Sequence, residues 1–191
     1  MTGGSENTSD EVLAVRAAGD DRAAFDCLVR RYKEPLYRFV RRYVGDADDA
    51  YDVLQDGFIS AWTSLSRFDP KRPFAPWLHT IMLNKCRDFG RRQTVRRAFL
   101  RLVALDAGES IVPHPGAGEA DEGIAARLHR LDKAVSNLTS YYKEPLLLTV
   151  VEGMSQEEVA KVLKTTRKAI EMRLYRARRK LAVELEQTRE G

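Results

Sequence analysis

Cysteine and histidine are scarce in this 191-residue sequence, and no long hydrophobic run occurs in it. The two cysteines, Cys27 and Cys86, are far apart and lack the spacing of metal ligands. We therefore predict neither a disulfide framework nor a zinc site, and we expect two small buried side chains. The three histidines, His79, His114 and His129, are also scattered, and the sequence has no Gly-rich phosphate loop or nucleophile elbow. The sequence thus predicts a protein that is not an enzyme and that holds no metal and no cofactor.

Stretches of about 18 apolar residues, the length of a membrane span, are absent. The N-terminus has neither a basic start nor an apolar segment. These absences predict no membrane insertion and a cytoplasmic location. With 43% hydrophobic and 31% charged residues, the chain has enough apolar surface for one or two ordinary domains with cores.

Charge is distributed unevenly along the chain, although the net charge is only +4. Residues 46–56 hold five aspartates and no base, whereas residues 85–101 hold seven bases and one acid. Residues 161–180 hold nine bases and a single acid, Glu171. The one acidic and the two basic segments are therefore more informative about the function than the net charge.

Apolar residues recur every three or four positions in most of the chain, which predicts helices. The clearest case is residues 21–43, where Pro35 is expected to kink or split the helix near Lys33. Gly45 and Asp46 are expected to end this helix and to cap the next one. Because no segment alternates with a period of two between turn signals, we predict an all-α fold.

Two segments divide this helical pattern. Residues 67–76 contain three prolines and predict a loop, with the next helix starting at Trp77. Residues 104–123 are rich in glycine, proline and acids and are typical of a flexible linker. The predicted organisation is a flexible tail over residues 1–9, a first domain over 10–94, a linker over 95–126 and a second domain over 127–191.

Several helix starts are predicted from capping signals. Residues 8–11 fit a capping box for the first helix, and Pro145 is expected to open a helix in the second domain. Ser155, with Glu158 three residues later, is expected to cap a helix over residues 156–163.

A helix-turn-helix is predicted at the end of the second domain. The helix capped by Ser155 is followed by a polar break over residues 164–166 and by a basic helix over residues 167–185. A helix of this kind fits the major groove of DNA, where its bases neutralise phosphates. The less specific alternative is that the basic face of this helix only contacts solvent and binds no DNA.

The other charged segments allow two interpretations each. Phe68, Phe74, Trp77 and Phe89 lie among bases, a mixture that suits stacking on single-stranded DNA, although aromatic residues at helical spacing are usually core. The carboxylates of residues 48, 52 and 56 form an i, i+4 stripe, which is either a solvated face or a surface for a basic protein partner.

Three motifs occur in one order: DADDAYDVLQDGFISAW, RPFAPWLHTIMLNKCRDFGRR and GMSQEEVAKVLKTTRKAIEMRLYRARRKL. In this order they resemble bacterial sigma-70 family sigma factors, and more closely the extracytoplasmic function (ECF) group. The resemblance covers about residues 22–92 and 127–185. It implies two small helical domains, sigma-2-like and sigma-4-like, joined by a flexible linker.

The resemblance also implies partners and contact residues. Such a factor binds core RNA polymerase at the beta-prime clamp helices and the beta flap, directs it to promoter DNA with −35 and −10 elements, and helps to open the duplex. It is expected to be a monomer when free and to be controlled by an anti-sigma factor.

The residues that match the surface for the clamp helices are Asp49, Asp52, Gln55 and Asp56. Those that match −10 recognition and melting are Arg67, Lys71, Arg72, Phe74, His79, Asn84, Lys85, Arg87 or Asp88, and Arg91. Those that match −35 recognition are Thr166, Arg167, Lys168, Glu171, Arg173, Arg176, Arg178 and Arg179.

The sequence departs from the family pattern at a few positions, so no promoter sequence can be transferred. Lys164 replaces the common turn glycine, Lys168 and Glu171 replace a frequent Gly and Lys, and Thr80 replaces a frequent Arg. Glu171 either accepts a hydrogen bond from cytosine N4 or pairs with Arg167 or Arg178 on the helix surface.

An ordinary dimeric helix-turn-helix regulator, which binds a palindrome without polymerase, is the alternative function. Residues 49–62 argue against it, because a sensor domain has no need of that acidic surface beside a basic, aromatic loop.

Overall fold

The structure is a computed structural model that describes residues 8–106 and 124–190. Within these residues it contains eight α-helices, one 3-10 turn and no β-strand, which confirms the all-α prediction. None of the helices in this part of the chain is long and apolar enough to cross a membrane.

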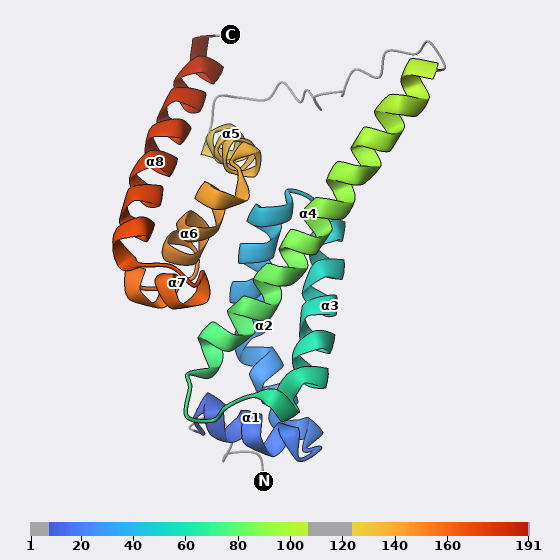
Figure 1. Cartoon of the computed structure of the whole chain (residues 1–191), viewed down its shortest axis with the longest axis vertical. Coiled ribbons are helices and arrows are strands. Elements are labelled where there is room, and N and C mark those ends of the chain that lie inside the picture. The colour runs from blue at the N-terminus through green and yellow to red at the C-terminus, as the bar shows by residue number, and fades with distance from the viewer. Residues whose placement is uncertain (1–7, 107–123, 191) are drawn as a thin grey trace.

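The first domain is built from four helices that pack on one another (Figure 1). They are α1 (Asp10–Ala18), α2 (Arg22–Val44), α3 (Ala47–Ser64) and α4 (Phe74–Asp106), with the 3-10 turn η1 (Leu65–Arg67) after α3. The apolar stripes of α1 to α4 face inward and form one core around Leu28, Phe39 and Met82. Helices α2 and α4 each contact all three other helices of this domain.

Helix α2 runs without a break through Pro35, so of the two predicted outcomes, a kink or a split near Lys33, the split does not occur. Leu28 lies on one side of the proline and Leu36 and Phe39 on the other, and all three side chains are fully buried. Packing on both sides of the proline thus keeps the helix continuous despite the missing backbone donor.

Local capping sets most helix starts. The Ser9 side chain accepts a hydrogen bond from the Val12 amide, and Asp46 accepts from the amides of Asp48 and Asp49. The predicted capping box over residues 8–11 does not form, because the Glu11 carboxylate instead accepts from the Phe74 amide at 3.1 Å.

Helix α4 therefore begins at Phe74, three residues before Trp77, where the sequence predicts its start. Pro76 lies in the first turn of α4, where no intrahelical donor is needed. Helix α4 then continues to Asp106 and takes in residues 95–106 of the predicted linker. The middle of that linker, residues 107–123, lies outside the described residues.

Gly57 allows α3 and α4 to approach closely. A Cβ atom at this position would lie 2.5 Å from both Sδ and Cε of Met82, closer than real Cβ contacts occur. The backbone of α3 thus lies directly against the end of the Met82 side chain, which would have to move if residue 57 carried a Cβ atom.

The second domain comprises α5 (Ile124–Asn137), α6 (Ser140–Val150), α7 (Gln156–Val162) and α8 (Arg167–Glu190). The capping box of Ser155 and Glu158 is confirmed, with Ser155 accepting from the Glu158 amide and donating its own amide to the Glu158 carboxylate. Helix α6 begins at Ser140 instead of Pro145, because the amides of Tyr142 and Lys143 both bond to the Thr139 carbonyl.

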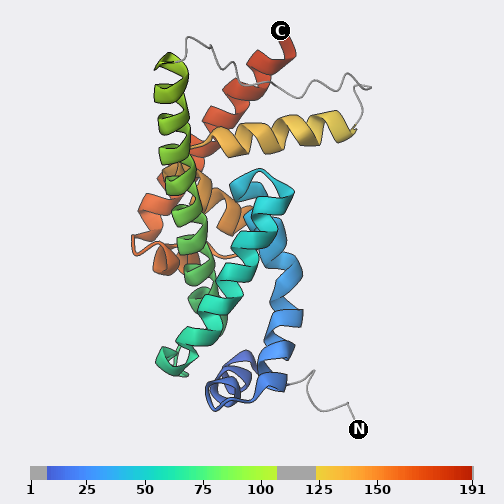
Figure 2. The ribbon, with the colours of Figure 1, turned by 90° about the vertical axis from the view of Figure 1, so that its right-hand side faces the viewer.

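The two domains pack against each other. Helix α2 contacts α5 and α6, and α4 contacts α7 (Figures 1 and 2). Figure 2 also shows α5 lying across the ends of α2 and α3. The face of α4 between these contacts is therefore an interdomain surface.

Both cysteines are buried, as predicted. Burial raises the pKa of the Cys86 thiol well above its ordinary value. No group of three or more His, Cys, Asp or Glu side chains in the described residues could hold a metal ion.

Candidate polymerase and DNA interfaces

The predicted polymerase contacts form one acidic face on α3. Asp52, Gln55 and Asp56 are exposed, and Asp49 is half-buried. All four line a groove of about 350 Å³ between α3 and α4. The opposite wall of the groove is formed by Lys85, Asp88, Phe89 and Arg92. The acidic face is open to solvent and is therefore available to a basic partner.

Asp46 fixes the start of this acidic face. Backbone hydrogen bonds, the largest from Asp49, hold the pKa of Asp46 below its ordinary value. The carboxylate also complements the positive end of the α3 dipole. Asp46 is thus a cap, whereas the acids further along α3 are not accounted for by capping.

The Pro-rich loop presents its bases outward. Arg67, Lys71 and Arg72 are exposed. Asp69 accepts a hydrogen bond from the Lys71 amide at 3.0 Å and pairs with the Arg72 guanidinium at 3.4 Å, so the loop turns about this carboxylate. These three predicted −10 contacts are accessible.

The aromatic residues of the loop pack inward instead. Phe68 and Phe74 lie edge-on with ring centroids 5.5 Å apart, and Trp77 contacts both rings. Phe74, a predicted DNA contact, is only 1% exposed and also packs against Tyr32. In this conformation the aromatic cluster is core, the second of the two interpretations of the sequence.

The predicted −10 residues on α4 fall into two groups. Asn84 and Arg91 are exposed and Lys85 is half-buried. His79 and Arg87 instead contact the second domain: His79 Nε2 lies 2.6 Å from Oε2 of Glu152. The side chains of this pair are only 4% and 3% exposed, so His79 is out of reach of DNA here.

Arg87 makes a two-pronged ion pair with Glu144 of α6. Its Nε and Nη2 atoms donate to the two carboxylate oxygens at 2.7 and 2.6 Å. These bonds raise the pKa of the Arg87 guanidinium. The hydroxyl of Tyr43 lies 3.3 Å from the same carboxylate and 3.1 Å from the Ser140 hydroxyl.

Lys143 closes the same side of the interface. Its Nζ donates to the carbonyl of Ser136 at 2.6 Å and to that of Tyr43 at 3.3 Å, near the C-terminal ends of α5 and α2. A cation is favoured at a helix C-terminus, and here it serves one helix from each domain. Burial lowers the pKa of Lys143.

The helix-turn-helix presents most of the predicted −35 contacts. Thr166, whose hydroxyl accepts from the Ala169 amide, starts α8. The exposed members of the set are Thr166, Arg167, Lys168, Glu171, Arg176, Arg178 and Arg179. Arg167 pairs with Glu157 of α7 at 3.0 Å, while Glu171 forms no ion pair among the described residues.

Arg173 differs from the other −35 residues. It is half-buried, and its guanidinium lies over the Tyr141 ring at 4.1 Å from the centroid. This cation–π contact turns the side chain toward α6 and away from the exposed face of α8. Arg173 therefore supports α8 rather than facing solvent.

Two sequence families match this chain, and each covers one of the two domains. Sigma-70 region 2 matches residues 28–96, which hold the acidic face, the Pro-rich loop and the face of α4. Sigma-70, region 4 matches residues 128–181, which hold the helix-turn-helix. This chain belongs to the sigma-70 family.

Relatives place the sigma factor in the ECF group. It is 38% identical over 184 residues to RNA polymerase sigma factor CnrH of Cupriavidus metallidurans, covering 93% of this chain and 95% of the relative. It is 28% identical over 178 residues to the ECF RNA polymerase sigma-E factor of Haemophilus influenzae, covering 91% and 94%. The resemblance seen in the sequence is thereby confirmed, and the dimeric regulator is set aside in favour of a transcription initiation factor.

Solved structures agree with this assignment. The sigma factor superimposes on CnrH in complex with the cytosolic domain of CnrY with a TM-score of 0.70 and 35% identity, covering 94% of this chain and 99% of that one. Its TM-score with RpoE of Bartonella quintana, in complex with the anti-sigma factor NepR, is 0.60 at 25% identity, covering 85% and 96%.

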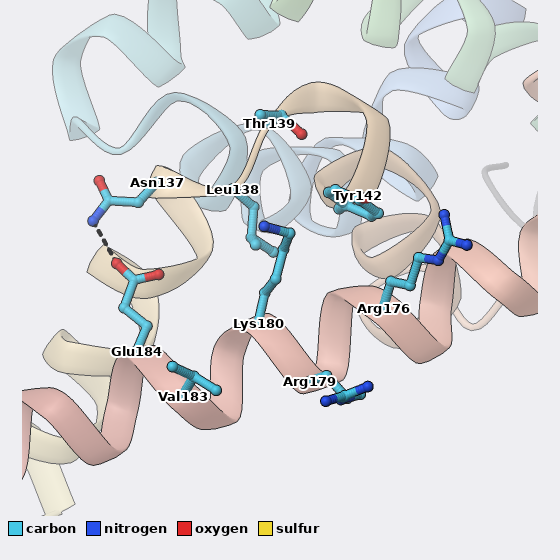
Figure 3. A pocket seen from close by; sticks show the side chains of 9 residues that line it. All are labelled: Asn137, Leu138, Thr139, Tyr142, Arg176, Arg179, Lys180, Val183 and Glu184. Carbon is cyan, nitrogen blue, oxygen red and sulfur yellow. Dashed lines mark hydrogen bonds between the residues drawn. The ribbon is translucent and has the colours of Figure 1, made fainter.

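A second groove of this sigma factor lies between α8 and the turn that joins α5 to α6 (Figure 3). It measures about 590 Å³. Leu138, Tyr142 and Val183 supply apolar surface, and the bases of α8 supply a positive rim. Asn137 donates to Glu184 at 2.7 Å across one end. The groove combines an apolar floor with positive charge, a combination that suits an amphipathic segment of a partner.

Sequence reasoning missed the residues of the second domain that hold α4. Glu144 and Glu152 are acids in an otherwise apolar stretch, residues 144–152, and Lys143 precedes it. Charged residues among leucines and valines could have indicated these contacts, because a charge that is buried with its apolar neighbours requires a partner.

Proposed function

We propose that this ECF sigma factor binds core RNA polymerase through the acidic face of α3, with Asp49, Asp52, Gln55 and Asp56 contacting the beta-prime clamp helices. The exposure of these side chains in one groove supports the proposal. The protein acts in the cytoplasm and has no catalytic activity of its own; it lends promoter specificity to the polymerase.

The two basic surfaces divide promoter recognition between them. The exposed face of α8 reads the −35 element, with Lys168, Arg176 and Arg179 among its accessible bases. The loop bases Arg67, Lys71 and Arg72, together with the face of α4, recognise and open the −10 element.

The apolar floor of the groove in Figure 3, formed by Leu138, Tyr142 and Val183, is the proposed seat of the beta flap, beside the bases of α8 that face the −35 element. An anti-sigma factor controls the protein by covering polymerase-binding surfaces. Support comes from two similar sigma factors, CnrH and RpoE, that were solved in complex with CnrY and with the anti-sigma factor NepR. Free of such partners, the protein is a monomer.

One observation carries the proposal: an open acidic face and two separate basic surfaces occur in one chain. Run-off transcription with purified core polymerase on a library of promoter fragments tests it. The triple variant Asp49→Asn, Asp52→Asn, Asp56→Asn should lose both core binding and transcription, because its three clamp-facing charges are removed.

The matched control removes three exposed carboxylates outside the acidic face, through Asp26→Asn, Glu34→Gln and Glu186→Gln. It should transcribe like the wild type. Unchanged core binding by the folded α3 variant would refute the clamp contact, and initiation without core polymerase would refute the sigma mechanism.

A further inference from the structure

One carboxylate interrupts the basic face of α8. Glu171 lies in the second turn of this helix and is the single acid beside nine bases in residues 161–180. Its side chain is exposed. In a helix-turn-helix, the first turns of the second helix are the part that reaches base edges in the major groove. Glu171 therefore lies where side chains that read a DNA sequence are expected.

The packing of α8 determines which of its sides is exposed. Ile170 and Leu174 are 0% and 2% exposed and belong to the stripe that faces the core, where α8 packs on α6 and α7. Arg167 lies four residues before Glu171 and Arg178 lies seven residues after it, so these three residues share one side of the helix. All three are exposed. The Glu171 carboxylate thus has an arginine on either side of it along α8.

Neither arginine pairs with Glu171. Arg167 instead pairs with Glu157 of α7 at 3.0 Å. Within residues 8–106 and 124–190, Glu171 forms no ion pair and no hydrogen bond through its side chain. The helix dipole favours acids in the first turn of a helix, and Glu171 comes after that turn. Of the two roles that the sequence allows for Glu171, surface pairing is therefore absent from the structure, and the hydrogen bond to a base is left.

An ionised carboxylate can only accept hydrogen bonds, and this limits the bases that it can read. In the major groove, guanine presents two acceptors, and thymine presents an acceptor and a methyl group. Adenine presents a donor beside an acceptor, whereas cytosine presents only its N4 donor. Cytosine is thus the base whose edge matches a carboxylate. The lysines and arginines of α8 are donors and match guanine instead, so Glu171 can read a base that they cannot.

We propose that Glu171 is a specificity-determining residue of this sigma factor and that it reads a cytosine of the −35 element. This inference rests on the proposed function, in which the exposed face of α8 binds that element. The N4 amino group of the cytosine donates a hydrogen bond to the Glu171 carboxylate. On DNA without this cytosine the carboxylate gains no donor and still repels the phosphates, so Glu171 also disfavours other sequences.

The expected effect is confined to one base pair. Cytosine should be favoured over guanine or thymine about tenfold at the position that Glu171 reads, which is a typical discrimination for one good contact to a base edge. Preferences at the other positions of the −35 element should not depend on Glu171, because well-separated base pairs contribute almost additively.

The test uses the full chain in complex with core RNA polymerase. The −35 element of the promoter found by run-off transcription is randomised, and a barcode in the transcribed part of each template identifies its −35 sequence. Glu171→Ala removes the acceptor, and Glu171→Gln supplies an amide, whose donor and acceptor match adenine. The control, Glu186→Gln, removes the same charge from an exposed position near the other end of α8. Circular dichroism confirms that all variants are folded.

Wild type and control should favour cytosine about tenfold at one position. Glu171→Ala should lose this preference, keep the preferences at the other positions, and transcribe templates without the cytosine more strongly than wild type does. Glu171→Gln should favour adenine at the same position. A cytosine preference that is equal in all four proteins would overturn the inference, and so would a Glu171→Ala variant that transcribes every template less without any change in preference.

A further variant separates this inference from the proposed function. Lys168→Glu with Arg179→Glu, two exposed bases of α8, should lower transcription from templates of every −35 sequence. If this variant fails while Glu171→Ala keeps the preferences of wild type, only the reading of cytosine by Glu171 is refuted. If wild type shows no preference at any position of the randomised element, the proposed role of α8 in −35 recognition is refuted as well.

Discussion

The two basic helix faces of this sigma factor differ in how they are covered. The outward face of α8 is open to solvent, and Lys168, Arg176 and Arg179 are all exposed on it. The corresponding face of α4 is partly occupied by carboxylates from α6 and from the segment after it. A basic segment in a sequence therefore identifies a surface that favours anions, but the packing of domains decides which anion it meets.

The largest expected effect concerns the open face of α8. Charge reversal through Lys168→Glu and Arg179→Glu should weaken binding to a −35 duplex about a hundredfold, because each lost contact to DNA is worth about 1–3 kcal/mol and the new acids repel phosphates. Fluorescence anisotropy with the −35 fragment of the identified promoter measures this.

The control for that experiment reverses two exposed bases of α2, through Arg22→Glu and Arg38→Glu. It makes the same change in net charge and should retain −35 binding within about twofold. An equal loss in the control would mean that net charge, not the face of α8, governs binding.

The next effect concerns the packing that holds α4 in the first domain. Gly57→Ala should be about 1 kcal/mol less stable than Gly90→Ala, because the end of the buried Met82 side chain must move aside for the new methyl group. Urea denaturation measures the change. Gly90→Ala is the matched control: nothing lies within 4 Å of its added Cβ, and it should stabilise α4 by about 0.5–1 kcal/mol. Equal effects of the two substitutions would contradict the close approach of α3 and α4.

A smaller effect is expected at the start of α4. Glu11→Ala removes the acceptor of the Phe74 amide, which should cost about 1 kcal/mol of stability and loosen the loop before it. Fewer open complexes should form on duplex promoters, while a pre-melted template should restore initiation. Glu11→Gln keeps an oxygen acceptor and should behave like the wild type. Failure of the pre-melted template to rescue Glu11→Ala would show a general folding defect.

The smallest effect is expected in the turn before α8. Lys164 adopts a φ of 50°, in the left-handed region that favours glycine. Lys164→Gly should therefore stabilise the second domain by about 0.5–1 kcal/mol, and thermal unfolding measures this. Lys161→Gly, in the last turn of α7, has ordinary helical backbone and should instead destabilise it, by at most about 1 kcal/mol. A loss of stability with Lys164→Gly would contradict this explanation.

Features set by local sequence were predicted well. The Ser155 capping box, the start of α3 at Asp46 and the exposed stripe of Asp52 and Asp56 all depend on residues within one or two helical turns. The helix-turn-helix belongs to the same class, because its break and its basic helix are contiguous in the chain.

Features set by distant contacts were not predicted. Helix α4 begins at Phe74 because Glu11, 63 residues away, accepts its amide proton. His79 and Arg87 pair with acids 73 and 57 residues away. No periodicity or spacing encodes such pairs, so the sequence indicated which side chains could bind DNA but not which of them contact the second domain.

The distance between the two domains in the free protein and in complex with core polymerase tests the account most directly. Dyes on Asp26→Cys and Lys161→Cys are suitable, because the native Cys27 and Cys86 are buried. The account predicts efficient energy transfer in the free protein and a clear loss of transfer when core polymerase binds. Low transfer in the free protein, or the same transfer in both states, would contradict it.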